Sequence, residues 1–174
     1  SLVNPEVEIE NDSRKKILVE YASFNALKPT HVGHLRIITL GESVSRLLES
    51  QGNKIFRVTY TSDIGLPAAK VVWALLESID EFKETKKKSL REKAEFLGKV
   101  YVKSHSAFEE SEEVREEIRE INTKIYQGDE KLTKIWKEAL NWTFEYFQTI
   151  YDLMGTKFDK EILESEVAES GAKI

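Results

Sequence analysis

The stretch "KPTHVGHLR", residues 28–36, holds two of the three histidines of the chain. His31 and His34 stand three residues apart around Gly33, and a short apolar run precedes them. Side chains three apart on a helix point the same way, so both imidazoles would lie on the first turn of a helix. Helix N-terminal amides and the helix dipole favour negative groups. The stretch therefore predicts a phosphate-binding turn at the start of a helix.

Strands and helices are expected to alternate around this turn. The apolar run at 16–23 predicts a buried strand, and the next run predicts a helix that ends near Gly52. The apolar residues with helical spacing in that second run are Ile37, Leu40, Val44, Leu47 and Leu48. A second strand is expected over 54–62 and a second helix over 66–79, with Pro67 in its first turn. This order predicts an α/β fold, a partial Rossmann-like nucleotide-binding fold with a parallel sheet.

The second half of the chain predicts an inserted helical subdomain. Charged residues fill a joint after Asp80, and apolar residues at helical spacing continue to Gly155 with a break at 127–129. Trp142 and Phe144 fall off the main apolar stripe, so we expect them in an exposed patch. The expected parts are a flexible lead-in at 1–15, the first half of the Rossmann-like domain at 16–88, a helical insertion at 89–155, and a segment at 156–174 that returns to extended structure towards a second half of the sheet.

Composition excludes several classes of protein. The chain has 174 residues, of which 40% are hydrophobic and 33% charged, which is typical of a folded protein in solution. No apolar run approaches the roughly 20 residues that span a bilayer, so no membrane partner is expected. The absence of cysteine excludes disulfides and fits a cytoplasmic protein. With a net charge of -5, any nucleic acid would have to bind through a local basic patch. Oligomeric state stays open.

The residue types around the turn suit adenylyl transfer. His31 and His34 can donate hydrogen bonds to phosphate oxygens, and Lys28 adds a mobile cation. Gly33 would allow a flat base to approach the main chain. The same pattern also fits a surface coincidence or a partial metal site. A zinc site would lack a third ligand nearby, so no metal site is expected.

The same residues resemble a known family. "HVGH" resembles the HIGH signature of class I aminoacyl-tRNA synthetases, and the longer "VEYASFNALKPTHVGHLR" is similar to its arginyl-tRNA synthetase version. The similarity continues in order through "LGESVSRLLESQGNKIFRVTYTSDIG", "LGKVYVKSHSAFEE", "QGDEKLTKIWKEAL" and "FDKEILESEV". It covers nearly the whole chain.

The resemblance implies an arginine--tRNA ligase. In that family the carboxylate of arginine attacks the α-phosphate of ATP, with Mg²⁺, and the arginyl group then passes to tRNA(Arg). Lys28, His31 and His34 would act on the ATP phosphates, as both catalytic and ATP-binding residues. Gly33 would contact the adenine.

The resemblance also implies an arginine site at the end of the first strand. Glu20 would accept the guanidinium, because a carboxylate can pair with this planar group through two hydrogen bonds. Ser23 and Asn25 would hold the α-amino and carboxylate groups. Without the family, Glu20 could instead be a structural ion-pair residue, although the guanidinium acceptor is favoured, and the other two would simply cap the turn.

Some positions depart from the family pattern, and some of its parts are missing. Phe24 stands where proline is common, Thr59 and Ser62 replace the usual Asn and Gly, and Pro67 replaces His or Gln, whereas Asp63 and Gly65 are retained. The second half of the nucleotide fold, a KMSKS-type loop and an anticodon-binding domain are not found in these residues. We therefore expect an inactive fragment. The alternatives are another adenylyl or nucleotidylyl transferase with an H-x-G-H turn, and a non-catalytic helical interaction module.

Overall fold

The computed structural model describes residues 14–171, except for the side chains of residues 169 and 170. Most of the expected lead-in at 1–15 therefore lies outside the described residues. The strands are β1 (Lys16–Glu20), β2 (Lys54–Thr61) and β3 (Lys160–Leu163). The helices are α1 (Val32–Ser50), α2 (Leu66–Glu77), α3 (Ile79–Thr85), α4 (Leu90–Glu110), α5 (Glu112–Tyr126), α6 (Glu130–Met154) and α7 (Glu164–Gly171). The predicted α/β fold is confirmed. No described helix is both long and apolar enough to cross a membrane.

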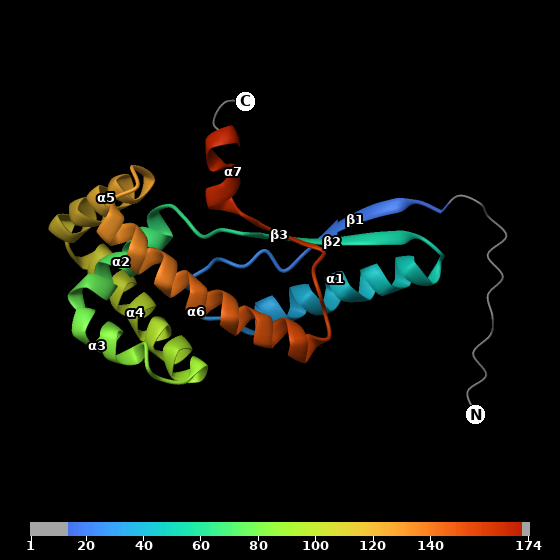
Figure 1. Cartoon of the computed structure of the whole chain (residues 1–174), viewed down its shortest axis with the longest axis horizontal. Coiled ribbons are helices and arrows are strands. Elements are labelled where there is room, and N and C mark those ends of the chain that lie inside the picture. The colour runs from blue at the N-terminus through green and yellow to red at the C-terminus, as the bar shows by residue number, and fades with distance from the viewer. Residues whose placement is uncertain (1–13, 172–174) are drawn as a thin grey trace.

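The three strands form a parallel sheet in the order β1-β2-β3. The register places Leu18 of β1 beside Phe56 of β2. Because side chains alternate along a strand, Leu18, Phe56 and Tyr60 share one face of the sheet, and all three are exposed. Arg57 points to the other face, where α1 runs along the sheet (Figure 1). One face of this sheet is therefore open, although parallel sheets are usually covered on both faces. The expectation of a buried strand over 16–23 was wrong for this reason, since β1 ends at Glu20 and its residues are exposed or half-buried.

Helix α1 forms where the sequence predicted it, but its apolar stripe does not pack inward. Its buried residues are Ile38, Glu42 and Ser45, whereas Ile37, Leu40, Val44 and Leu47 are exposed. The helix meets the sheet through a small residue, Gly41. A Cβ atom at Gly41 would lie 2.2 Å from the ring of Tyr21, so only glycine allows this approach. The stripe that predicted the helix is left facing solvent.

A helical cluster holds the larger hydrophobic core. Buried residues of α2 pack against α4, α5 and α6, and α6 extends from this cluster to the sheet (Figure 1). The charged joint expected after Asp80 contains α3, which buries Phe82. The ring of Trp142 lies 4.9 Å from that of Phe82, and its side chain is 3% exposed. The expectation of an exposed Trp142 was therefore wrong, because α3 covers it. Phe144 is half-buried. It packs against this larger core and against a second, smaller core beside the sheet.

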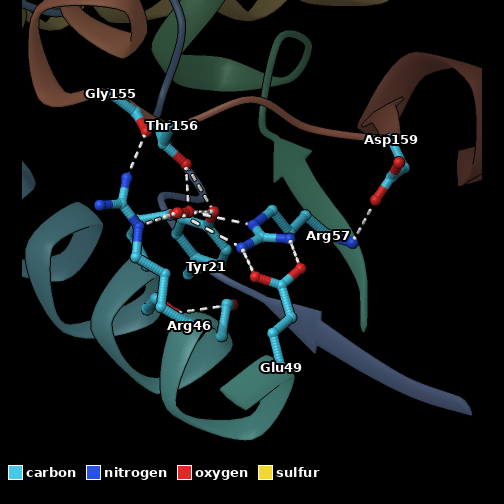
Figure 2. Close-up of polar contacts among 10 residues, drawn as sticks. Tyr21, Arg46, Glu49, Arg57, Gly155, Thr156 and Asp159 are labelled. Carbon is cyan, nitrogen blue, oxygen red and sulfur yellow. Dashed lines mark hydrogen bonds and ion pairs between the residues drawn. The ribbon is translucent and has the colours of Figure 1, made fainter. Parts of the chain in front are cut away.

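A buried polar network joins α1 to the end of β1, to β2 and to the segment just before β3. The carboxylate of Glu42 accepts hydrogen bonds from Tyr21, Thr156, Arg46 and Arg57. Arg57 also pairs with Glu49, and its backbone N–H donates to Asp159 just before β3 (Figure 2). Burial alone would raise the pKa of Glu42, but the hydrogen bonds, first of all those from Arg57, lower it to about 2. Burial raises the pKa of Tyr21 to about 12.

This network predicts a defined acid sensitivity. The lowered pKa means that ionised Glu42 stabilises the fold fully above about pH 4.5 and loses this contribution as pH falls through about 2. We expect Glu42→Gln to lower the free energy of unfolding by about 3 kcal/mol at pH 7, since each pKa unit corresponds to about 1.4 kcal/mol. Urea unfolding of both proteins at several pH values measures this difference, which should shrink between pH 4.5 and 2. Glu109→Gln, at an exposed position of α4, is the control and should change little. A difference independent of pH would contradict the assignment.

Candidate active site

The chain segments that follow the three strands meet at one edge of the sheet. The loop after β1 pairs with the end of β2, where the Ala26 N–H donates to the Ser62 carbonyl at 2.8 Å. The Ser62 hydroxyl donates to the carboxylate of Glu164, the first residue after β3, at 2.5 Å. Ligands of parallel α/β sheets bind outside this carboxyl edge. The residues predicted to act together therefore lie at the edge where such a site belongs.

The two histidines of the opening stretch cap helix α1. His31 is the N-cap residue, and its Nδ1 accepts the Gly33 N–H at 3.1 Å. The His31 N–H donates in turn to Nδ1 of His34 at 3.1 Å, and the two rings stack with centroids 4.0 Å apart. This is a capping box built from imidazoles. Because both Nδ1 atoms accept hydrogen bonds, the neutral rings must carry their protons on Nε2. Nε2 is then the donor atom of each neutral ring.

The surroundings of His34 favour its neutral form. Burial lowers the pKa of His34, and the nearby His31 and Lys28 lower it further. On its other side the ring lies 4.5 Å from that of Phe24, centroid to centroid. The ammonium of Lys28 lies 6.0 Å from the centre of the Tyr101 ring of α4. Imidazole N–H groups and a lysine ammonium are donors suited to phosphate oxygens.

Glu20 and Ser23 form a second pair at the end of β1. The Ser23 hydroxyl donates to the Glu20 carboxylate, and the Ser23 N–H donates to the buried Thr59 hydroxyl at 3.2 Å. The backbone between them is strained, because Ala22 and Ser23 have φ values of +72° and +46°. This bend leaves both Glu20 and Ser23 exposed. Thr59, which replaces the usual Asn of the family, thus supports the bend.

The structure joins these two pairs through neighbouring residues. Ser23 contacts Glu20, and the adjacent Phe24 contacts His34, so the carboxylate and the imidazoles flank one loop. Asn25 is exposed and bridges to β2. At Gly33 a Cβ atom would lie 2.9 Å from the His31 ring, so this glycine also makes room for the cap.

Sequence reasoning missed one carboxylate of this edge. Glu164 reaches Ser62, which pairs with the loop that carries Asn25. The signal was present, since "KEIL" is a short strand and an acidic residue follows it directly. Beneath this edge Asp63 is 1% exposed and accepts hydrogen bonds from Ser165. The turn after β2 is therefore locked to the start of α7.

A cavity of about 500 Å³ lies beside the histidine turn. It is formed between the loop after β1, α4 and α6, and its lining includes Pro29, Thr30, Arg91, Gly98 and Tyr146. Within residues 14–171, no group of three or more His, Asp or Glu side chains is placed to hold a metal ion. The chemistry of this edge is that of hydrogen-bond donors, one lysine and carboxylates.

Comparisons with known proteins agree with this geometry. Residues 1–170 match the family model of class I (R) tRNA synthetases, catalytic domain. The chain is 36% identical over 160 residues to the arginine--tRNA ligase of Borreliella afzelii, covering 92% of this chain and 27% of that protein. It is 31% identical to the enzyme of the same name from Thermococcus kodakarensis, covering 94% of this chain and 26% of that protein. The chain thus spans about a quarter of the length of these relatives.

Solved structures show the same fold. The arginyl-tRNA synthetase of Thermus thermophilus matches with a TM-score of 0.67 and 26% identity, covering 90% of this chain and 24% of that one. The Plasmodium falciparum enzyme matches with a TM-score of 0.68 and 21% identity, covering 96% and 28%. The imidazole cap at the carboxyl edge of a parallel sheet, the extended motif around it and the family match agree. The chain therefore belongs to the class I arginyl-tRNA synthetase family and forms part of its catalytic domain.

Proposed function

We propose that this chain supplies the ATP and arginine sites of an arginine--tRNA ligase. The observation that carries the proposal is the imidazole cap of α1, whose two neutral rings have Nε2 as their donor atom and which flanks the same loop as the strand-end carboxylate of Glu20. The similarity to ligases of this name supports the substrate assignment. The same similarity favours the cytoplasm as the place of action.

In the proposed first step, an oxygen of the arginine carboxylate attacks the α-phosphorus of ATP. The bond from that phosphorus to the bridging oxygen of the β-phosphate breaks, and pyrophosphate leaves with Mg²⁺, which arrives as part of the substrate. His31, His34 and Lys28 stabilise the negative charge that develops on the phosphate oxygens. They do so by position and charge, with no covalent enzyme intermediate. Gly33 leaves the main chain accessible to the adenine.

Arginine binds, in this proposal, at the bend after β1. Glu20 pairs with the guanidinium, and Ser23 and Asn25 hold the α-amino and carboxylate groups. The contact between Ser23 and Glu20 orients the carboxylate before the substrate arrives. The terminal adenosine of tRNA(Arg) then takes the arginyl group from the adenylate.

The proposal assigns these residues to one part of a larger catalytic domain. Two apolar surfaces, the Leu18–Phe56–Tyr60 face of the sheet and the apolar stripe of α1, are exposed. The relatives are about four times as long as this chain. Such surfaces suit contacts with the rest of a catalytic domain.

Loss of the imidazoles tests the assignment in the complete ligase that contains this chain. His31→Ser keeps a good N-cap residue but removes the Nε2–H donor, so folding and catalysis are separated. We expect arginine-dependent exchange of pyrophosphate into ATP to fall by about 100-fold, the effect of losing one transition-state donor. His34→Ala should show a similar loss. His105→Ala, at an exposed position of α4, is the control. An unchanged exchange rate in His31→Ser would favour the non-catalytic module.

Glu20→Gln tests which substrate the site recognises. The amide has the same shape but no charge, so the guanidinium loses its ion pair while ATP is unaffected. We expect the KM for arginine to rise by at least about tenfold and the KM for ATP to change by less than about twofold. Steady-state pyrophosphate exchange measures both values in one series. If the KM for arginine stays constant and another substrate supports exchange, the site is that of a different adenylyl transferase.

The isolated chain should bind ATP weakly and should not charge tRNA. Its site is open, and the second half of the nucleotide fold expected from the family is not among these residues. We expect isothermal titration with ATP and Mg²⁺ to give a Kd above about 1 mM, which corresponds to roughly -4 kcal/mol. Tight binding together with turnover in a tRNA-charging assay would show that these 174 residues suffice.

A further inference from the structure

Tyr21 lies directly between the proposed arginine-binding residue Glu20 and the strained bend at Ala22 and Ser23. Its N–H makes the last ladder contact of β1, donating to the Val58 carbonyl at 3.1 Å. Its ring is fixed on two sides. It lies against the bare backbone of Gly41 in α1, and the Phe158 ring stands 4.8 Å away. The side chain is therefore buried and held in one orientation.

The Tyr21 hydroxyl reaches residues far away in the sequence. It lies 2.7 Å from Oε2 of Glu42 and 2.5 Å from Oγ1 of Thr156, and Thr156 lies 2.9 Å from the same carboxylate oxygen (Figure 2). The hydroxyls of Tyr21 and Thr156 have two protons for these three contacts, so the two hydroxyls and the Glu42 carboxylate share their hydrogen bonds. Thr156 belongs to the turn after α6, which Arg46 also holds through the Gly155 carbonyl. The end of β1 is thereby tied to the turn that leads into β3.

The anchor acts on a backbone that would otherwise relax. Residues with φ above zero that are not glycine cost about 1–3 kcal/mol each and persist only when their surroundings hold them. On the far side of the bend, the Ser23 N–H donates to the Thr59 hydroxyl at 3.2 Å, and the Phe24 carbonyl accepts the Ser62 N–H at 3.1 Å. The near side of the bend is held by Tyr21. Loss of that hold would change where Glu20 and Ser23 point.

We propose that Tyr21 is a positioning residue for arginine recognition. Its bond to Glu42 and Thr156 sets the orientation of the Glu20–Ser23 pair, so the turn after α6 controls a site to which it contributes no ligand. Tyr21 itself contacts no substrate in this proposal. The inference rests on the proposed function, because Glu20 and Ser23 are assigned to arginine there.

Tyr21→Phe in the complete ligase removes the hydroxyl and leaves the ring in place. We expect the KM for arginine in pyrophosphate exchange to rise by about fivefold to tenfold, the size of effect expected for the loss of one ordinary hydrogen bond. The KM for ATP and kcat should stay within about twofold, because the histidine turn is anchored separately. Hydrogen exchange of a peptide spanning residues 17–24 should become faster.

Two further variants make the test specific. Thr156→Val should raise the KM for arginine in the same way, and the double variant should show less than the sum of the two effects, since the hydroxyls share one carboxylate. Thr143→Val is the matched control. Like Thr156→Val, this variant loses a buried hydroxyl. The Thr143 hydroxyl, however, donates within its own helix α6, to the Ala139 carbonyl. This control should leave the KM for arginine unchanged.

The outcomes separate the two proposals. If the unmodified ligase shows no arginine-dependent exchange, the proposed function fails and the positioning role fails with it. If the unmodified ligase is active but Tyr21→Phe lowers only the melting temperature, with the KM for arginine unchanged, Tyr21 is merely structural and only this inference is overturned. A rise of both KM values to the same degree would also overturn it, because it would show a general distortion of the site.

Discussion

The charge of Glu42 is the constraint on which the arrangement of this chain depends. A buried carboxylate is unfavourable unless it is paired and hydrogen-bonded. Here the partners come from the end of β1, from β2 and from the turn before β3, so satisfying one charge fixes four elements against each other. Gly41, next to Glu42 in α1, allows Tyr21 to approach closely enough to take part. A polar centre thus joins α1 to the sheet, next to the smaller hydrophobic core that contains Phe24, Ile38 and Phe147.

The histidine turn is a second place where a few polar side chains fix the local structure. A helix N-terminus normally needs a small polar residue to accept its first free amides. His31 and His34 fill that role with Nδ1, so Nε2 is the donor atom of each neutral ring. One pair of side chains therefore caps the helix and, in the proposed function, also contacts the phosphates. Protonation of Nδ1 would remove an acceptor of the cap, so the lowered pKa of His34 serves the fold as well as the chemistry.

Local patterns predicted the elements well, and contacts across the fold explain what they missed. The motif 28–36 and the Gly155 stop each encode their own structure, and the structure has them at those places. The apolar run at 16–23 gives a shorter strand, 16–20, whose residues are exposed or half-buried because one face of the sheet is open. Trp142 was misplaced because its cover, α3, lies in a segment that looked too charged to fold back. Glu164 was overlooked because its relevance depends on pairing β3 with β2, a contact about 100 residues apart. The part played by Tyr21 needed Thr156 and Glu42, and no spacing rule connects these three.

Two requirements of a binding site are met by different parts of this structure: the orientation of the proposed ligand-binding residues, and the exclusion of water from the site. Residues that would bind arginine and phosphate are oriented within these 174 residues, by the bend after β1 and by the cap of α1. Exclusion of water, which strengthens every such contact, needs surfaces on both sides of the site. Here the outer face of the sheet and the stripe of α1 remain apolar and exposed. The side chains proposed to bind arginine and phosphate are thus held in place within this chain, and its exposed apolar faces suit contacts with the rest of a catalytic domain.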